Sequence, residues 1–233
     1  MIGKVIGVYA LTALISYLLG SISFATIFTY LFTKKDIRTM GSGNAGATNV
    51  LRSVGAWPAV LTLIGDVGKG VAAVLIGSAL FSAFDIRSIS GEYANEIGRG
   101  VAGLFALLGH LFPLYFGFKG GKGVLTAAGI CLVMNPVCLL VCLAAFLICL
   151  AISKIVSLSS CIACAMLPVS MFVYTYFFQY KTSTEPHINY VVIMTLLAFV
   201  YAAIVIFMHR SNIERLKNGT ESRISVKKKE KQA

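Results

Sequence analysis

The chain has 233 residues, of which 58% are apolar and only 12% charged, and it carries a formal net charge of +11. A soluble domain has about twice this charged fraction, whereas the mean hydropathy here is +0.84. The composition excludes a soluble globular protein and predicts an integral membrane protein with one domain over residues 1–221.

Apolar runs follow one another along the chain, each close to or above the roughly 20 residues that a helix needs to cross a bilayer. They cover residues 5–32, 57–84, 101–116, 123–152, 155–178 and 190–208. Pro136 disfavours helix at Asn135, so we expect the 123–152 run to divide there. The sequence thus predicts an all-α integral membrane protein with seven transmembrane helices.

Lys and Arg residues predict the orientation, because they are enriched in cytoplasmic loops. With the N-terminus outside, seven spans place residues 33–56, residues 117–122, Lys154 and the C-terminus in the cytoplasm. Residues 210–233 hold eight Lys or Arg against three Glu, and we expect 222–233 to be a disordered basic tail attracted to anionic lipids. The chain has no basic domain with interleaved aromatic residues, which argues against nucleic-acid binding.

The first polar segment between apolar runs is Gly41-Ser-Gly-Asn-Ala-Gly-Ala-Thr-Asn-Val-Leu-Arg52. It matches the GxGxxG dinucleotide pattern, but no strand is predicted before it, and Asp66, 20 residues beyond Gly46, lies in an apolar run. Glycines instead allow close backbone approach, and Arg52 offers a planar fork for a phosphate dianion. Neutral donors come from Ser42, Asn44, Thr48 and Asn49. We interpret the segment as a phosphate-binding loop, the alternative being a flexible polar loop.

A second glycine-rich segment runs from Gly109-His-Leu-Phe-Pro113 to Phe118-Lys-Gly-Gly-Lys-Gly123. It is no Walker A loop, because Lys122 is not followed by Ser or Thr and no strand precedes it. Two lysines among three glycines at the start of a helix nevertheless combine positive charge, backbone donors and a favourable dipole. His110, beside this segment, is a candidate functional residue.

Asp66 and Lys69 stand three residues apart within an apolar run, so they share a helix face and can pair. Ionisable groups at membrane depth are costly and mark a site or a polar cavity. We expect the pair to face the interior near the two glycine segments, although a purely structural pair is the alternative. The segment beginning at His209 is predicted to form a short interfacial helix that ends at Asn218-Gly219.

All six cysteines fall within predicted spans, where they behave as small apolar residues. Cys161-Ile-Ala-Cys164 matches CxxC but has no second pair at metal-binding spacing. No metal site and no cofactor are predicted.

These motifs together resemble the bacterial membrane acyl-phosphate:glycerol-3-phosphate acyltransferases. The family's three cytoplasmic motifs are similar to the 41–52 segment, to the Gly109–Gly123 segment, and to Asn212-Ile-Glu-Arg-Leu-Lys-Asn-Gly-Thr-Glu221. The resemblance implies transfer of a fatty acyl group from acyl phosphate to the 1-hydroxyl of sn-glycerol 3-phosphate, an early step of phospholipid biosynthesis. It also implies a multi-pass protein of the bacterial cytoplasmic membrane that works beside the soluble enzyme making acyl phosphate.

The resemblance also suggests roles for residues. Those expected to be catalytic are Ser42, Arg52, His110 and Asn212. Those expected to bind substrate are Gly43, Asn44, Gly46, Thr48, Asn49, Asp66, Lys69, Lys119, Gly120, Gly121, Lys122 and Gly123. The general base stays open: a substrate phosphate oxygen could accept the hydroxyl proton, His110 could act as the base, or Ser42 could form a covalent acyl-enzyme.

Two other classes of function are alternatives. A transporter or channel for an organic phosphate would also carry basic glycine loops, but it usually shows two related halves, and no internal repeat is visible here. A non-catalytic membrane scaffold would leave Asp66, Lys69 and the glycine segments unexplained.

Overall fold

The computed structural model describes residues 2–90, 93–183 and 187–224, and within them every regular element is helical. Most of the predicted basic tail, residues 225–233, lies outside the described residues. The chain divides into two compact units, Met1–Pro136 and Val137–Ala233.

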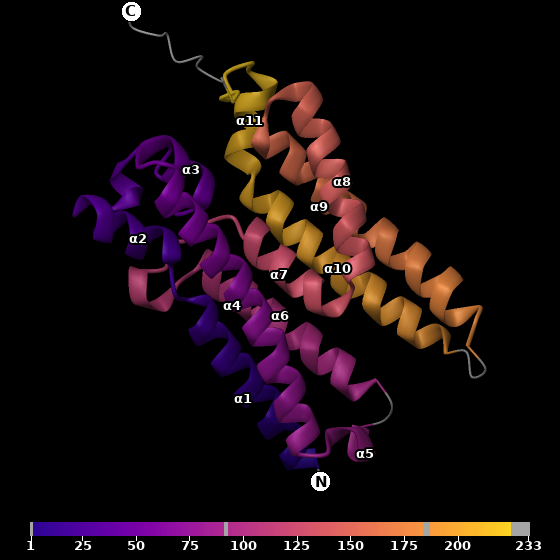
Figure 1. Ribbon diagram of the computed structural model, residues 1–233. Coiled ribbons are helices and arrows are strands. Elements are labelled where there is room, and N and C mark those ends of the chain that lie inside the picture. Colours follow the sequence, from indigo (N-terminus) through magenta and orange to yellow (C-terminus); the bar gives the residue numbers. More distant parts are fainter. Residues whose placement is uncertain (1, 91–92, 184–186, 225–233) are drawn as a thin grey trace, which may run out of the picture. The chain divides into compact units, whose positions relative to one another are not determined.

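The first unit contains seven α-helices and two short 3₁₀ turns among its described residues. They are α1 (Ile2–Gly20), α2 (Phe24–Thr33), η1 (Ile37–Thr39), α3 (Ala47–Ser53), α4 (Ala56–Ala83), α5 (Ile86–Ser90), α6 (Ala94–Leu111), η2 (Leu114–Phe116) and α7 (Val124–Met134). Helices α1, α4 and α6 pack side by side, and α7 lies against α4 (Figure 1).

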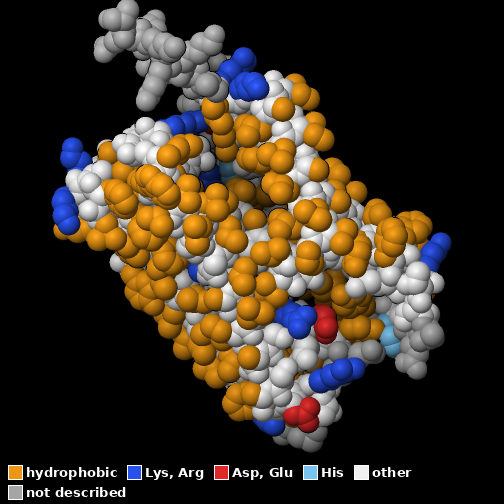
Figure 2. All heavy atoms as spheres, in the orientation of Figure 1, with side chains coloured by type: hydrophobic (Ala, Val, Ile, Leu, Met, Phe, Trp, Pro, Cys, Tyr) orange, Lys and Arg blue, Asp and Glu red, His pale blue; other side chains and the backbone are white. Residues whose placement is uncertain are grey.

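Small residues allow these helices to approach closely, as is usual where lipid leaves no hydrophobic force between helices. Gly109 of α6 lies against the backbone of Tyr17 in α1, while Gly70 of α4 and Gly129 of α7 each lie against the other helix's backbone. Large apolar side chains instead face outward, among them Ile64 and Leu75 of α4. Figure 2 shows hydrophobic side chains spread over the face of α1 and α4.

The second unit is built from long apolar helices. They are α8 (Pro136–Ser153, which begins at the last residue of the first unit), α9 (Val156–Tyr174), the π-helical turn η3 (Thr175–Tyr180), α10 (Ile188–Met208) and α11 (Arg210–Lys217). Helices α9 and α10 pack together, and α11 contacts α9. The expected short helix after His209 is therefore confirmed, and it ends before Asn218 as predicted.

Six helical segments in the described part of the chain are long and apolar enough to cross a membrane: 2–33, 56–83, 94–116, 136–153, 156–180 and 188–208. The break at Asn135-Pro136 is confirmed, because α7 ends at Met134 and α8 begins at Pro136. Helix α7 has only 11 residues, or about 16 Å, against a hydrocarbon core of about 30 Å. Seven crossings and the orientation of the termini stay predictions.

The run expected over residues 5–32 is not one helix, since it is interrupted between Gly20 and Phe24. Figure 1 shows that α2 turns away from the direction of α1. Ser21 hydrogen-bonds back to the Tyr17 carbonyl, and Lys69 donates to the Ile22 carbonyl at 2.8 Å. Polar partners thus satisfy backbone groups that a break would otherwise leave bare in an apolar surrounding.

Candidate active site

The first glycine segment, residues 41–46, connects η1 to α3 and is shaped by the side chain of Asn49. The Asn49 amide nitrogen donates to three backbone carbonyls, those of Ile37 (3.3 Å), Met40 (2.9 Å) and Asn44 (3.0 Å). Its oxygen accepts the Ser42 amide at 3.0 Å and the Ser53 hydroxyl at 3.3 Å. Asn49 is buried and uses both ends of its amide within the loop, so it folds the segment.

Other side chains of this region project outward. Ser42, Thr48 and Arg52 are exposed, and none of the three side chains has a hydrogen bond or ion pair to the described residues. Gly43 has φ +72°, a conformation that glycine adopts readily and other residues avoid. The region therefore presents two hydroxyls and one guanidinium on its surface, while Asn49 holds the backbone of the segment from the buried side.

The second glycine segment, residues 118–123, lies between η2 and the N-terminus of α7. The Gly120 amide donates to the Leu111 carbonyl at 3.1 Å and the Gly121 amide to the His110 carbonyl at 3.2 Å. Lys119 is exposed and Lys122 is half-buried. As predicted, the segment that carries both lysines leads into the N-terminus of a helix, α7, where the dipole favours an anion.

The two glycine segments meet in the structure. A Cβ built on Gly121 would lie 2.5 Å from the Ala45 carbonyl oxygen, so only glycine allows this approach. A second link comes from Arg38 of η1, which donates to the Phe116 carbonyl just before the second segment. Segments more than 75 residues apart in the sequence thus form one surface that carries Arg52 and Lys119.

Asp66, Lys69 and His110 form a buried cluster under this surface. Lys69 Nζ lies 3.0 Å from Asp66 Oδ1, and His110 Nδ1 lies 3.5 Å from the same oxygen. Each of the three side chains is at most 6% exposed. The predicted pairing and inward orientation of Asp66 and Lys69 are confirmed, whereas the interaction with His110 was not foreseen.

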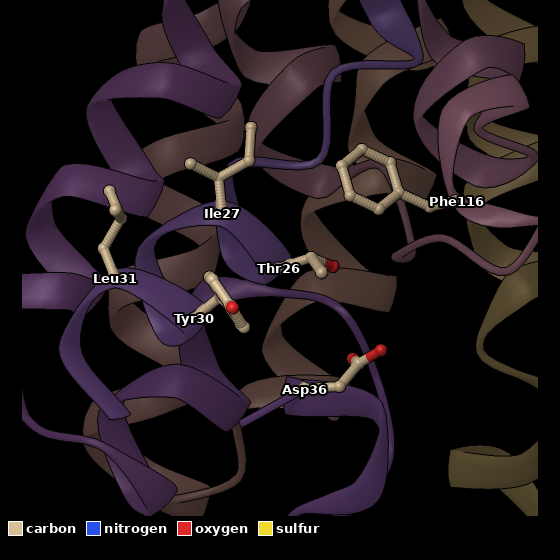
Figure 3. A pocket seen from close by; sticks show the side chains of 6 residues that line it. All are labelled: Thr26, Ile27, Tyr30, Leu31, Asp36 and Phe116. Atoms are coloured by element: carbon tan, nitrogen blue, oxygen red, sulfur yellow. The ribbon is translucent and has the colours of Figure 1, made fainter. Parts of the chain in front are cut away.

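A pocket of about 320 Å³ lies beside α2. Its lining is mostly apolar and comes from α2, the following loop and η2: Thr26, Ile27, Tyr30, Leu31, Asp36 and Phe116. Asp36 lies across the pocket from Ile27 and Leu31 (Figure 3). Its carboxylate accepts hydrogen bonds from the side chain of Arg38, which lower the pKa of Asp36 below its ordinary value.

In the second unit, Asn212 belongs to a network around Glu221. The Asn212 side-chain amide (2.6 Å) and the Ser157 hydroxyl (2.7 Å) donate to Glu221 Oε1, and Arg215 donates to Oε2 at 2.7 Å. Burial raises the pKa of Glu221, but these hydrogen bonds outweigh it and the net shift is downward. The network ties the end of α11 to α9. It holds Asn212, which is buried.

The structure therefore brings together most of the residues that the sequence predicts for the site, but it separates them into exposed groups and buried supports. Sequence reasoning missed Ala45, the Ile22 carbonyl and Arg38 as contributors. Ile22 lies between two serines in an otherwise apolar run, but serine is tolerated in membrane helices, so this pattern does not predict the break. Nothing in the sequence near Ala45 indicates its contact with Gly121.

Known proteins match this chain over nearly its whole length. The family model described as glycerol-3-phosphate acyltransferase matches residues 10–219. A protein of that name from Neisseria meningitidis is 39% identical over 92% of this chain and 96% of its own length. The corresponding Clostridioides difficile protein is 39% identical over 94% and 97%. The chain belongs to the glycerol-3-phosphate acyltransferase family.

Solved structures agree with this assignment. The crystal structure of PlsY, described as an integral membrane glycerol 3-phosphate acyltransferase in its glycerol 3-phosphate form, is 34% identical, with a TM-score of 0.73. The match covers 93% of this chain and 96% of PlsY. A second PlsY structure, the lysophosphatidic acid form, gives a TM-score of 0.71. The resemblance inferred from the three motifs is confirmed at the level of the family and of a multi-span membrane protein.

Proposed function

We propose that this protein transfers a fatty acyl group from acyl phosphate to the 1-hydroxyl of glycerol 3-phosphate, releasing phosphate and 1-acyl-glycerol 3-phosphate. The observation that carries the proposal is the meeting of the two glycine segments at Ala45 and Gly121, with an exposed cation on each side. Both substrates have a phosphate group, and glycine-rich backbone with Arg or Lys suits phosphate. Two neighbouring phosphate sites fit a reaction between two phosphorylated molecules.

We assign the first glycine segment to the acyl phosphate. Arg52 and Thr48 bind its phosphate, and Ser42 donates a hydrogen bond to the acyl carbonyl oxygen as negative charge develops there. Gly43, Asn44 and Gly46 give the backbone its close approach, and Asn49 keeps the segment in shape. The exposure of Ser42, Thr48 and Arg52 supports their direct roles.

The second glycine segment is assigned to glycerol 3-phosphate. Lys119 and Lys122 bind its phosphate together with the backbone of residues 120–123 at the start of α7. Holding both phosphates on one surface brings the glycerol hydroxyl next to the acyl carbonyl, and such positioning alone accelerates a bimolecular reaction strongly.

The chemical step needs no base from the protein. The 1-hydroxyl oxygen attacks the acyl carbonyl carbon, the bond from that carbon to the phosphate oxygen breaks, and the hydroxyl proton passes to the departing phosphate. The burial of His110 behind Gly121 favours this pathway over one in which His110 takes the proton. We therefore treat His110 as a residue that positions the site, and the role of Asn212 in activity stays a prediction.

The pocket beside α2 is suited to part of the acyl chain. Its lining is mostly apolar, and it lies next to the loop that leads into the first glycine segment. Its one carboxylate, Asp36, is paired with Arg38. The positive charge of the loops further supports an inner-membrane protein whose site faces the cytoplasm.

The test uses purified protein in lipid, labelled glycerol 3-phosphate and three separate donors: palmitoyl phosphate, palmitoyl-coenzyme A and palmitoyl-acyl carrier protein. We expect lysophosphatidate only from palmitoyl phosphate, and none from the Arg52→Ala variant. Arg87→Ala, which removes an exposed arginine from α5, is the matched control and should keep wild-type activity. Product from a thioester would overturn the donor assignment, and a stable labelled acyl-protein would favour the covalent pathway through Ser42.

A further inference from the structure

The pair of Asp66 and Lys69 is buried among other groups of the protein. Lys69 Nζ binds Asp66 Oδ1 at 3.0 Å and the Ile22 carbonyl at 2.8 Å, and it lies 5.9 Å from the centre of the Phe24 ring. The two side chains are 1% and 2% exposed. Neither group can therefore reach a substrate on the exposed surface above it.

A buried ion pair is weak evidence for a role in stability, because well-packed apolar residues of similar volume often replace one without loss. The placement of this pair points to another role. Asp66 Oδ1 also lies 3.5 Å from His110 Nδ1, so the carboxylate joins the pair on α4 to a ring on α6.

The other edge of the His110 ring supports the second glycine segment. A Cβ at position 121 would collide with His110 Nε2, and the Gly121 amide donates to the His110 carbonyl at 3.2 Å. Gly121 in turn lies against the Ala45 carbonyl of the first segment. A continuous series of contacts thus runs from Lys69 through Asp66, His110 and Gly121 to Ala45.

We propose that Asp66 and Lys69 are positioning residues that set the place of the second glycine segment through His110. Asp66 fixes the orientation of the imidazole, and Lys69 fixes Asp66 and anchors it to the break between α1 and α2. The glycine backbone then rests on the ring at the position that binds glycerol 3-phosphate. The inference rests on the proposed function and replaces the expectation that Asp66 and Lys69 bind substrate directly.

The decisive experiment compares two double variants, Asp66→Asn/Lys69→Met and Asp66→Leu/Lys69→Met. Both remove the buried charges, and asparagine and leucine have similar shapes. Only asparagine keeps an oxygen that can accept a hydrogen bond from His110 Nδ1. Gly68→Ala, at an exposed position of the same helix with open space around it, is the control for substitution in α4.

We expect the KM for glycerol 3-phosphate to be about tenfold or more higher in the leucine double variant than in the asparagine one, since a shift of about 1 Å in a binding group has effects of this order or larger. The KM for palmitoyl phosphate should be similar in both. Equal KM values for glycerol 3-phosphate in the two doubles would overturn the proposal, whether both match wild type, as for a purely structural pair, or both are equally impaired, as for direct binding.

A measurement without turnover separates this inference from the proposed function. Thermal stabilisation by inorganic phosphate should be weaker in the leucine double variant than in the asparagine one, and equal stabilisation would overturn the inference. Wild-type protein that makes no lysophosphatidate would reject the function alone. If the leucine double variant does not fold, His110→Phe is the substitute, because it leaves the ion pair in place. It should show the same rise in the KM for glycerol 3-phosphate, and an unchanged KM would contradict the proposal.

Discussion

The two glycine segments present similar backbone surfaces, but each segment is kept in place by different contacts. Asn49 folds the first through neutral hydrogen bonds, and it follows that segment by only a few residues. The second instead rests on His110 of α6, which is linked to a charged pair on α4. The comparison teaches that a loop shaped locally depends on its own sequence, whereas a loop shaped from a distance depends on how the helices pack.

The contact at Gly121 is shared by both segments, so disturbing it should have the largest effect. Gly121→Ala would push a methyl group into His110 and the Ala45 carbonyl. Because both groups are held in place, the segments must separate, and a displacement of about 1 Å is expected to lower kcat/KM by roughly 10²-fold. Steady-state kinetics with palmitoyl phosphate and glycerol 3-phosphate measure the loss.

Gly68→Ala is the matched control for this substitution. Gly68 lies in α4, and a Cβ added there would meet nothing within 4 Å, while alanine is the better helix former by about 1 kcal/mol. Its activity should equal that of wild type. Wild-type kinetics for Gly121→Ala would show that the two segments do not depend on this contact.

The local support of the first segment is the next to test. Asn49→Asp keeps the oxygen that accepts from Ser42 but replaces the donor to three carbonyls with a second oxygen. The loop then loses three hydrogen bonds, and the new oxygen faces three carbonyl oxygens that keep only their backbone donors, so the free energy of unfolding should fall by on the order of 3 kcal/mol. Unfolding of the purified protein in detergent measures this change.

Kinetics of the same variant sharpen the comparison. Asn49→Asp should raise the KM for palmitoyl phosphate more than that for glycerol 3-phosphate, the reverse of the pattern expected when His110 loses its acceptor. Thr48→Val, an exposed neighbour whose hydroxyl has no bond to the described residues, should not change stability. Equal effects of Asn49→Asp on both KM values would mean that the segments do not act on separate substrates.

Local patterns in the sequence predict much of this architecture. Apolar runs predict the helices, Pro136 predicts the break before α8, and the three-residue spacing predicts the pairing of Asp66 with Lys69. The break near Ile22 escapes prediction because serine is tolerated in membrane helices, and the group that supports the break, Lys69, comes 47 residues later.

The candidate site shows the same division. Glycine, hydroxyl and basic residues mark the two segments, because phosphate chemistry requires those types. Sequence does not separate the groups that face outward from the groups that hold them: Asn49 and Thr48 are neighbours with similar polarity, yet one is 4% exposed and bonded throughout while the other is exposed. That distinction depends on packing between helices, which no local pattern encodes.

The smallest effect is expected at Asp36, which forms a surface ion pair with Arg38, the residue that links η1 to the Phe116 carbonyl. The Arg38 hydrogen bond holds the pKa of Asp36 below its ordinary value. The pair therefore stabilises the fold at a pH above the ordinary carboxyl range, and this contribution disappears as the pH falls through the lowered pKa. Because both side chains are about 30% exposed, solvent screening keeps it below about 1 kcal/mol.

Unfolding midpoints of wild type and Asp36→Asn, measured in detergent across acidic and neutral pH, test this expectation. Wild type should be slightly more stable at neutral pH, and the two midpoints should converge in acid as Asp36 becomes protonated. A difference that stays constant with pH would mean that the carboxylate charge contributes nothing. A large difference between the midpoints would mean that this surface ion pair supports the site as strongly as the buried pair. The burial of Asp66 and Lys69 would then no longer explain why the second segment depends on a charged pair.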